Sequence, residues 1–239
     1  MILSPMSSVD LRSVAAYLPD VPSSWTTEQL RRSIGGLISR LREEQIEIPD
    51  VHLCYNHDET GKVMYQYPLI QYRHHKDRPL SIWAYGRGVP VLMNLVGYME
   101  SLYDSNHKKY PIRSIDIYPI RTSIGLRSDY HKYQLIGWIP LNSNNYKQFK
   151  NQDLDGSEMQ SRLSDILAGH IKGCMKGLGL PISVHINPII EQITRTSYRT
   201  FRVKKECIDI IFRSRVLLPD YICIGKESAF GAGLIKRIA

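Results

Sequence analysis

The sequence predicts an α+β protein with two tandem ferredoxin-like modules. Residues 11–120 alternate in the order strand, helix, strand, strand, helix, strand. Residues 130–225 begin the same order again, with a strand, a long helix and further strand-like segments. A chain of 239 residues is also long enough for two modules that each bury a core. The halves share no evident sequence repeat, so the doubling is one of element order.

The first module begins with LRSVAAYLP (11–19), which predicts a strand. In the helix predicted after it, Thr26 and Gln29 fit a capping box. Its apolar residues recur at helical spacing: Leu30, Ile34, Leu37, Ile38 and Leu41. After the turn signal DETG, the remaining elements predicted are strand VMYQYPLIQY with Pro68 at an edge or bulge, strand PLSIWAYG, helix VPVLMNLVGYMESLY and strand IRSIDIYPI.

The second module begins with YHKYQLIGWIPL (130–141), which predicts a strand. A long amphipathic helix over 157–180 follows, with Ser157 and Gln160 as its capping box and an apolar stripe typical of core packing. The polar, glycine-containing TSIGLRSD (122–129) favours a boundary there. We therefore expect domains at 1–125 and 126–239.

Composition and charge limit the function. No apolar run approaches the length of a membrane span, and the first fifteen residues lack the pattern of a secretory signal, so we expect a cytoplasmic protein without membrane partners. The formal net charge is +8, yet residues 1–50 carry −2 and residues 195–239 carry +6. A basic C-terminal third suits a polyanion such as RNA or DNA, and it is equally compatible with a protein that is merely basic.

The cysteines and histidines give no metal signature. The four cysteines are far apart and form no C-x-x-C pair, so we expect reduced thiols that are mostly buried or half-buried. The eight histidines lack zinc-ligand spacing, and His170 on the long helix is expected to be a satisfied, half-buried residue. No metal or other cofactor is predicted.

The C-terminal segment GKESAFGAGLIKRI (225–238) is rich in glycine. Glycine lets a backbone bend and approach a ligand closely, while lysine and serine side chains offer donors. The spacing fits neither a Walker A loop nor a Rossmann turn. A ligand-binding loop and a plain glycine-rich connection both remain open.

Three stretches together resemble a known family. YNHDETGKVMYQYPLIQYR, IGWIPLNSNNYKQFKN and GKESAFGAGLIKRI are similar, in the right order, to segments of the CRISPR-associated repeat-processing endoribonucleases of subgroup b, within the RAMP superfamily. In that subgroup a triplet like H-N-H precedes a YRYPLIQYK-like strand; here the triplet is Tyr55, Asn56 and His57. The LN-x-x-NY segment corresponds to Leu141–Tyr146.

The resemblance implies two ferredoxin-like modules of the RNA-recognition (RRM-like) type with a C-terminal glycine-rich loop. It also implies cleavage of CRISPR precursor transcripts within each repeat, without metal, to leave a 2′,3′-cyclic phosphate and a 5′-hydroxyl. The partners it implies are the CRISPR repeat RNA and other subunits of a CRISPR effector complex. The protein itself would be a monomer or homodimer.

This chemistry gives histidine a role, because one proton must leave the ribose 2′-hydroxyl and another must reach the departing 5′-oxygen. His57, at the second histidine of the triplet, is the candidate acid or base. Tyr55 departs from the triplet and is a candidate to position the 2′-hydroxyl or share the proton transfer; His52 is a weaker replacement. The departure keeps open an RNA-binding subunit with weak or no catalysis. A metal-dependent nuclease lacks a supporting cluster of carboxylates and histidines.

Further residues are candidates for RNA contact, each equally compatible with a solvated surface position. Those of the glycine-rich segment are Gly225, Lys226, Ser228, Gly231 and Gly233. The broader candidates are Arg31, Arg32, Lys172, Lys176, Lys204 and Lys205. Tyr65 and Tyr67 alternate along a predicted strand, where they either stack on bases or pack within the sheet.

Overall fold

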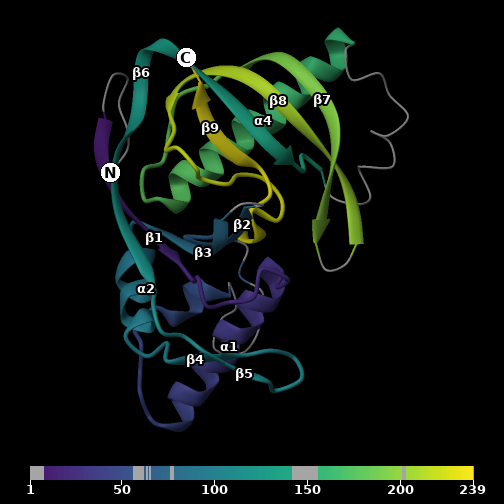
Figure 1. Ribbon diagram of the computed structural model, residues 1–239. Helices are drawn as coiled ribbons and strands as arrows, with labels where there is room; N and C mark the ends of the chain where they lie inside the picture. Colours follow the sequence, from purple (N-terminus) through teal and green to yellow (C-terminus); the bar gives the residue numbers. More distant parts are fainter. Residues whose placement is uncertain are drawn as a thin grey trace. The chain divides into compact units, whose positions relative to one another are not determined.

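The computed structural model describes residues 8–55, 62, 64, 66–75, 78–141, 156–200 and 203–238. Two compact units result: an N-terminal unit of residues 11–121 with 229–231, and a C-terminal unit built mainly from residues 122–228 and 232–239. The elements of the chain (Figure 1) are, in order, β1 Ser8–Tyr17, α1 Thr27–Glu43, the 3-10 helix η1 Val51–Cys54, β2 Ile70–His75, β3 Arg78–Tyr85, α2 Gly88–Val96, β4 Ser101–Tyr103, β5 Lys109–Pro111, β6 Asp116–Trp138, α4 Ser157–Gly177, β7 Ile189–Thr200, β8 Val203–Leu217, the 3-10 helix η2 Ser228–Phe230 and β9 Leu234–Ile238.

The N-terminal unit has the strand order β2-β3-β1-β6, to which β6 contributes residues 116–121. Strand β3 pairs antiparallel with both neighbours, with Ala84 opposite Val14 on β1 and Ile82 opposite Tyr72 on β2. Helix α1 packs against β2, and α2 packs against β3. This is the ferredoxin-like arrangement that the element order predicts.

Helix α1 forms as its sequence predicts. The Thr26 side chain accepts from the Gln29 backbone N–H, and the Gln29 side chain accepts from the Thr26 N–H, so both halves of the capping box are present. The five apolar residues predicted to share one face are all buried. Removing this stripe from water stabilises the helix, which in isolation would be marginal at this length.

Strand β2 and helix α2 are shorter than the sequence predicts. Strand β2 begins at Ile70, after Pro68, because proline has no N–H to give to a sheet ladder. Tyr67 therefore lies outside the strand, and its hydroxyl accepts from the Gln71 side-chain amide at 2.9 Å; Tyr65 lies outside the described residues. Helix α2 ends at Val96, and the last residues predicted as helix form β4, which pairs with β5 in a short hairpin.

The C-terminal unit repeats the same order as β7-β8-β6-β9. Strands β7 and β8 form a long antiparallel hairpin, seen in green in Figure 1, with a register that runs from Ile189 opposite Arg213 to Thr200 opposite Val203. Helix α4 contributes the fully buried Leu163, Leu167 and Ile171 to the core. The TSIGLRSD segment lies inside β6, which continues without a break from one unit into the other.

The C-terminal unit departs from the ferredoxin-like pattern between β8 and β9. A second helix would stand there, whereas residues 218–233 are largely irregular and their single helical turn is η2. The glycine-rich segment thus occupies the place in the chain where the second helix is expected. Its backbone needs other partners, and it finds some of them in the bonds from Ile224 N–H to the Gly233 carbonyl and from Gly233 N–H to the Gly137 carbonyl.

The predicted capping box of α4 is wrong. Ser157 is already the first helical residue, and the cap is Gly156, which has no side chain to offer. The Gln160 N–H bonds to the Gly156 carbonyl at 3.0 Å, as in any first helical turn. The S-x-x-Q pattern is therefore one residue too late in the chain to act as a cap.

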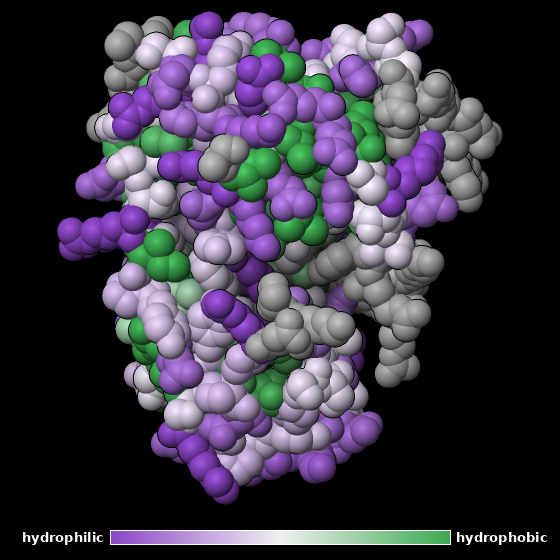
Figure 2. Space-filling model, turned by 45° about the horizontal axis from the view of Figure 1, so that its top comes forward, coloured by the Kyte–Doolittle hydropathy of each residue, from purple (hydrophilic) through white to green (hydrophobic). Residues whose placement is uncertain are grey.

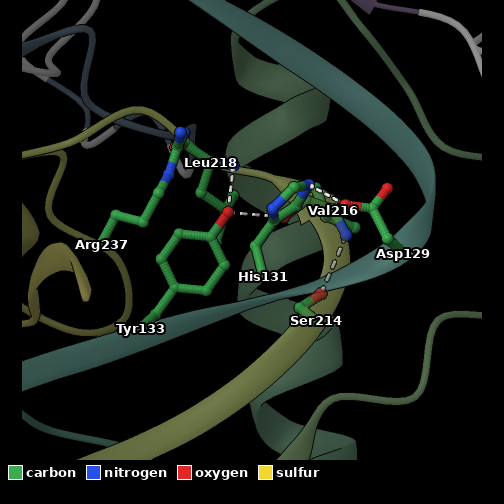
Figure 3. Close-up of polar contacts among 7 residues, drawn as sticks. All are labelled: Asp129, His131, Tyr133, Ser214, Val216, Leu218 and Arg237. Atoms are coloured by element: carbon green, nitrogen blue, oxygen red, sulfur yellow. Dashed lines mark hydrogen bonds and ion pairs between the residues drawn. The ribbon is translucent and has the colours of Figure 1, made fainter. Parts of the chain in front are cut away.

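Tyr133 on β6 fixes the point where β8 ends (Figure 3). Its buried hydroxyl donates to the Val216 carbonyl at 3.1 Å and accepts from the Leu218 N–H at 3.0 Å. The Arg237 guanidinium donates to the Leu218 carbonyl at 3.3 Å, and burial raises the pKa of Tyr133. This network holds the irregular segment at its start, since every bond in it would leave a buried polar group unpaired if broken.

All four cysteines are free and buried, as the sequence predicts. On the face drawn in Figure 2, hydrophobic residues occur in separate groups among hydrophilic ones. Within the described part of the chain, no helix is long and apolar enough to cross a membrane.

Replacing Gly233 by alanine should destabilise the fold. Gly233 has φ +70°, and an added Cβ would lie 1.9 Å from the Ile224 carbonyl oxygen, so the backbone must move. We expect a loss of more than about 3 kcal/mol in the free energy of unfolding.

Gly169→Ala is the matched control, because Gly169 is helical and nothing lies within 4 Å of its added Cβ. This substitution should stabilise the protein by about 0.5–1 kcal/mol. Thermal and urea denaturation measure both, and equal stability of the two variants would contradict the packing described.

Candidate active site

Tyr55 and His57 form the predicted catalytic pair, and of the two the structure describes Tyr55. It follows η1, and its N–H bonds to the His52 carbonyl at 3.2 Å, which closes the last 3-10 turn. Its side chain is half-buried. The other member, His57, lies outside the described residues. The described part of the site therefore consists of Tyr55 and the groups that hold it.

Two arginines of α1 bind Tyr55 at its two ends. Arg31 donates from Nη2 to the main-chain carbonyl of Tyr55, and Arg42 donates from Nη2 to its hydroxyl at 2.7 Å. The arginines are three helical turns apart and so share one side of α1. One helix face thus fixes both the backbone and the side chain of Tyr55.

Arg31 is enclosed by contacts within the protein. Its guanidinium lies 4.8 Å from the centroid of the Phe230 ring, in the segment 229–231 that belongs to the N-terminal unit. Burial lowers the pKa of Arg31, because desolvation disfavours the charged form. The Tyr55 carbonyl and the Phe230 ring offset part of the desolvation cost of the Arg31 charge. Arg31, predicted to contact RNA, is thus held by internal contacts.

Cys54, which precedes Tyr55, and its partner Tyr72 stay protonated at neutral pH. The Tyr72 hydroxyl donates to the Cys54 carbonyl at 3.1 Å, and both side chains are buried. Burial raises the pKa of the Cys54 thiol to about 12 and raises that of Tyr72 well above its usual value. A thiol that stays protonated is a poor nucleophile, so Cys54 has a packing role.

The glycine-rich segment is folded against its own unit. Gly225 has φ +89°, and a Cβ there would lie 2.7 Å from Trp138 Nε1 and 3.3 Å from His170 Nδ1. Gly225 and Gly233 therefore have packing reasons to be glycine, apart from any approach to RNA; Gly231 has φ +93°. Lys226 is exposed, whereas Ser228 is 4% exposed and so does not present its hydroxyl to solvent.

The structure brings together few of the predicted RNA contacts. Arg31 meets Tyr55, and Lys205 forms an ion pair with Glu227 in the glycine-rich segment. Arg32 on α1 is exposed. On α4, Lys176 is exposed and Lys172 is half-exposed. The Lys204 side chain lies outside the described residues. Among the residues that the structure describes, no group of three or more His, Cys, Asp or Glu residues could hold a metal ion.

Sequence reasoning missed two residues of this site. The sequence pattern assigns no role to Arg42, nor to Phe230 within GKESAFGAG. A phenylalanine inside an otherwise small and polar loop was the available signal, since such a side chain needs a partner. Nothing in the sequence distinguishes Arg42 from its neighbour Arg40.

The strand order and the two helix-covered units define the chain as a protein with two ferredoxin-like modules in tandem. Family models for the Cas6b N-terminal domain and the Cas6b C-terminal domain match residues 29–121 and 125–238. The chain therefore belongs to the Cas6b family, and the resemblance found in the sequence is confirmed.

Solved structures agree with this fold. A crystal structure of Cas6b is 21% identical with a TM-score of 0.74, and one of the CRISPR RNA processing endoribonuclease Cas6b is 18% identical with a TM-score of 0.67; each match covers 96% of this chain and 100% of that chain. The type IV Cas6 crRNA endonuclease Csf5 is 12% identical with a TM-score of 0.53, over 97% of this chain and 100% of the other. No curated protein matches the sequence significantly.

The free energy of unfolding should decrease at acidic pH because of His170. Its Nδ1 accepts from the Trp138 indole N–H at 3.0 Å, and burial lowers its pKa from 6.5 to about 4. In the unfolded chain His170 becomes protonated near pH 6.5, whereas in the folded chain it becomes protonated only near pH 4. The contribution of His170 is thus complete above pH 6.5 and is lost as the pH falls to about 4, by up to roughly 3 kcal/mol.

Urea denaturation between pH 4 and 7 measures this dependence. His170→Asn keeps an acceptor near the position of Nδ1 and does not titrate, so its stability should vary less with pH than that of the wild type. Identical slopes in the two proteins would show that His170 is not the group responsible.

Proposed function

We propose that this protein cleaves CRISPR precursor transcripts within each repeat to release guide RNAs, without a metal ion. Membership of the Cas6b family supports processing of CRISPR RNA in general. The observation that carries the proposal for this chain is the doubly held Tyr55, whose carbonyl and hydroxyl are each bound by an arginine of α1. A side chain fixed in this way is suited to positioning a reacting group.

The proposed reaction is an internal transesterification. A base removes the proton from the ribose 2′-hydroxyl, O2′ bonds to the adjacent phosphorus, and the bond from phosphorus to O5′ breaks as O5′ gains a proton. The products are a 2′,3′-cyclic phosphate and a 5′-hydroxyl, and no water is consumed. We assign His57 to a proton transfer, because an imidazole titrates near neutral pH. We assign Tyr55 to positioning the reacting groups.

RNA contacts outside the reacting groups are proposed for the exposed cations. Lys226, Arg32 and Lys176 are exposed, so they can reach a phosphate without breaking an internal contact. Neutralising phosphates would make binding weaken as the salt concentration rises. Arg31 is excluded from this group by its contacts with Tyr55 and Phe230.

Cleavage of the cognate repeat RNA should proceed in EDTA. The repeat is taken from the CRISPR array beside the gene, and the products are identified by mass. An RNA with a single 2′-deoxy at the scissile nucleotide should bind and remain intact, since it lacks the nucleophile. Cutting of that RNA would overturn the chemistry, and loss of activity in EDTA with rescue by a divalent ion would indicate a metal-dependent nuclease.

His57→Ala should bind the repeat RNA as the wild type does and cut it about 10²–10⁴-fold more slowly, as expected when a general acid or base is lost. Single-turnover cleavage and gel-shift binding separate the two effects. Full activity in this variant would remove His57 from the mechanism. Tight binding with no cleavage by the wild type, at any pH or with any metal, would establish instead an RNA-binding subunit without catalysis.

A further inference from the structure

Arg42 is an exposed cation fixed to the side chain of Tyr55. It stands in the last turn of α1 and donates from Nη2 to the Tyr55 hydroxyl at 2.7 Å. None of the ion pairs found among the described residues involves it. The helix dipole favours a positive charge at this end, which helps to stabilise the guanidinium there.

The other arginines of α1 are placed differently. Arg31 is enclosed by Phe230 and the Tyr55 backbone, and Arg40 donates to the Ser101 carbonyl at 3.2 Å while lying 4.7 Å from the centroid of the Tyr103 ring. Arg32 is exposed and has no contact with Tyr55 among those found. Arg42 alone of the four binds the Tyr55 hydroxyl and remains exposed.

The direction of this hydrogen bond determines what the pair can bind. Since the Tyr55 oxygen accepts from Arg42, the hydroxyl hydrogen points away from the guanidinium. A group bound beside the Tyr55 hydroxyl therefore lies next to a cation. Guanidinium carries five N–H donors in a planar fork, of which this bond uses one, and that fork matches the oxygens of a phosphate.

The pair is also held in place before any ligand arrives. Arg31 and the turn of η1 fix the backbone of Tyr55, and α1 fixes the Cα of Arg42. A site fixed in advance loses less conformational entropy when an anion binds. Donors that need not reorganise during a reaction stabilise developing charge most effectively.

We propose that Arg42 is a catalytic residue that binds a non-bridging oxygen of the phosphate at the cleaved bond, with the Tyr55 hydroxyl as its partner. This role rests on the proposed function. Negative charge grows on the non-bridging oxygens as O2′ bonds to phosphorus and before the bond to O5′ breaks. A cation at those oxygens stabilises the transition state more than the bound RNA, and Arg42 gives up no proton in doing so.

The first test compares single-turnover rates at saturating repeat RNA from the neighbouring CRISPR array. Arg42→Ala should be about 10–100-fold slower than the wild type, with part of the rate restored in Arg42→Lys. Arg162→Ala removes one exposed positive charge from α4, in the C-terminal unit, and should keep nearly the wild-type rate at saturation. Tyr55→Phe and Arg42→Ala should be non-additive when combined, because they act on one pair.

The second test replaces one non-bridging oxygen of the scissile phosphate by sulfur, in each of the two stereoisomers. Sulfur accepts hydrogen bonds from a guanidinium poorly, so one stereoisomer should slow the wild type. Arg42→Ala has no such contact to lose and should show a much smaller difference between oxygen and sulfur. A structural defect would leave that difference unchanged.

Three outcomes would overturn the role of Arg42. They are a wild-type rate in Arg42→Ala, a slow Arg42→Ala that keeps the full sulfur effect, and equal losses in Arg42→Ala and Arg162→Ala at saturation. If the wild type cleaves the repeat and any of these is found, only this role fails. If the wild type does not cleave the repeat, the proposed function fails as well.

Discussion

The site depends on how the Arg31 charge is accommodated. This guanidinium lies in partly desolvated surroundings, where a cation without partners would be costly. The carbonyl of Tyr55 and the ring of Phe230 supply those partners from two distant stretches of chain. Their positions follow from the need to stabilise one cation. Tyr55 then presents its hydroxyl to Arg42 on the same helix face.

Much of the fold could be predicted because its signals are local. The apolar stripe and capping box of α1 lie within a few turns of one helix, and the order of elements needs no knowledge of their contacts. Errors arose where two local readings compete. The S-x-x-Q pattern fits a cap at Ser157, but the helix begins one residue earlier than that cap requires; the strand predicted from residue 63 starts at Ile70, beyond Pro68.

Less of the site could be predicted, because its contacts join distant residues. Arg31 and Tyr55 are 24 residues apart and Arg42 and Tyr55 are 13 apart, spacings that no periodicity marks. The family resemblance drew attention to Tyr55 and His57, yet it said nothing of the arginines that hold Tyr55. Gly225 likewise attracted notice as flexible, whereas its packing against Trp138 and His170 is a three-dimensional constraint.

The membership of residues 229–231 in the N-terminal unit has a consequence for synthesis of the protein. The ribosome completes residues 11–121 long before it reaches Phe230, so the nascent N-terminal unit carries Arg31 without its aromatic partner. Domains generally fold as their residues emerge, at about 5–20 residues per second. The N-terminal unit therefore forms the contact between Arg31 and Phe230 several seconds after its own residues are made. The support that this contact gives to Tyr55 through Arg31 is complete only when the glycine-rich segment has been translated.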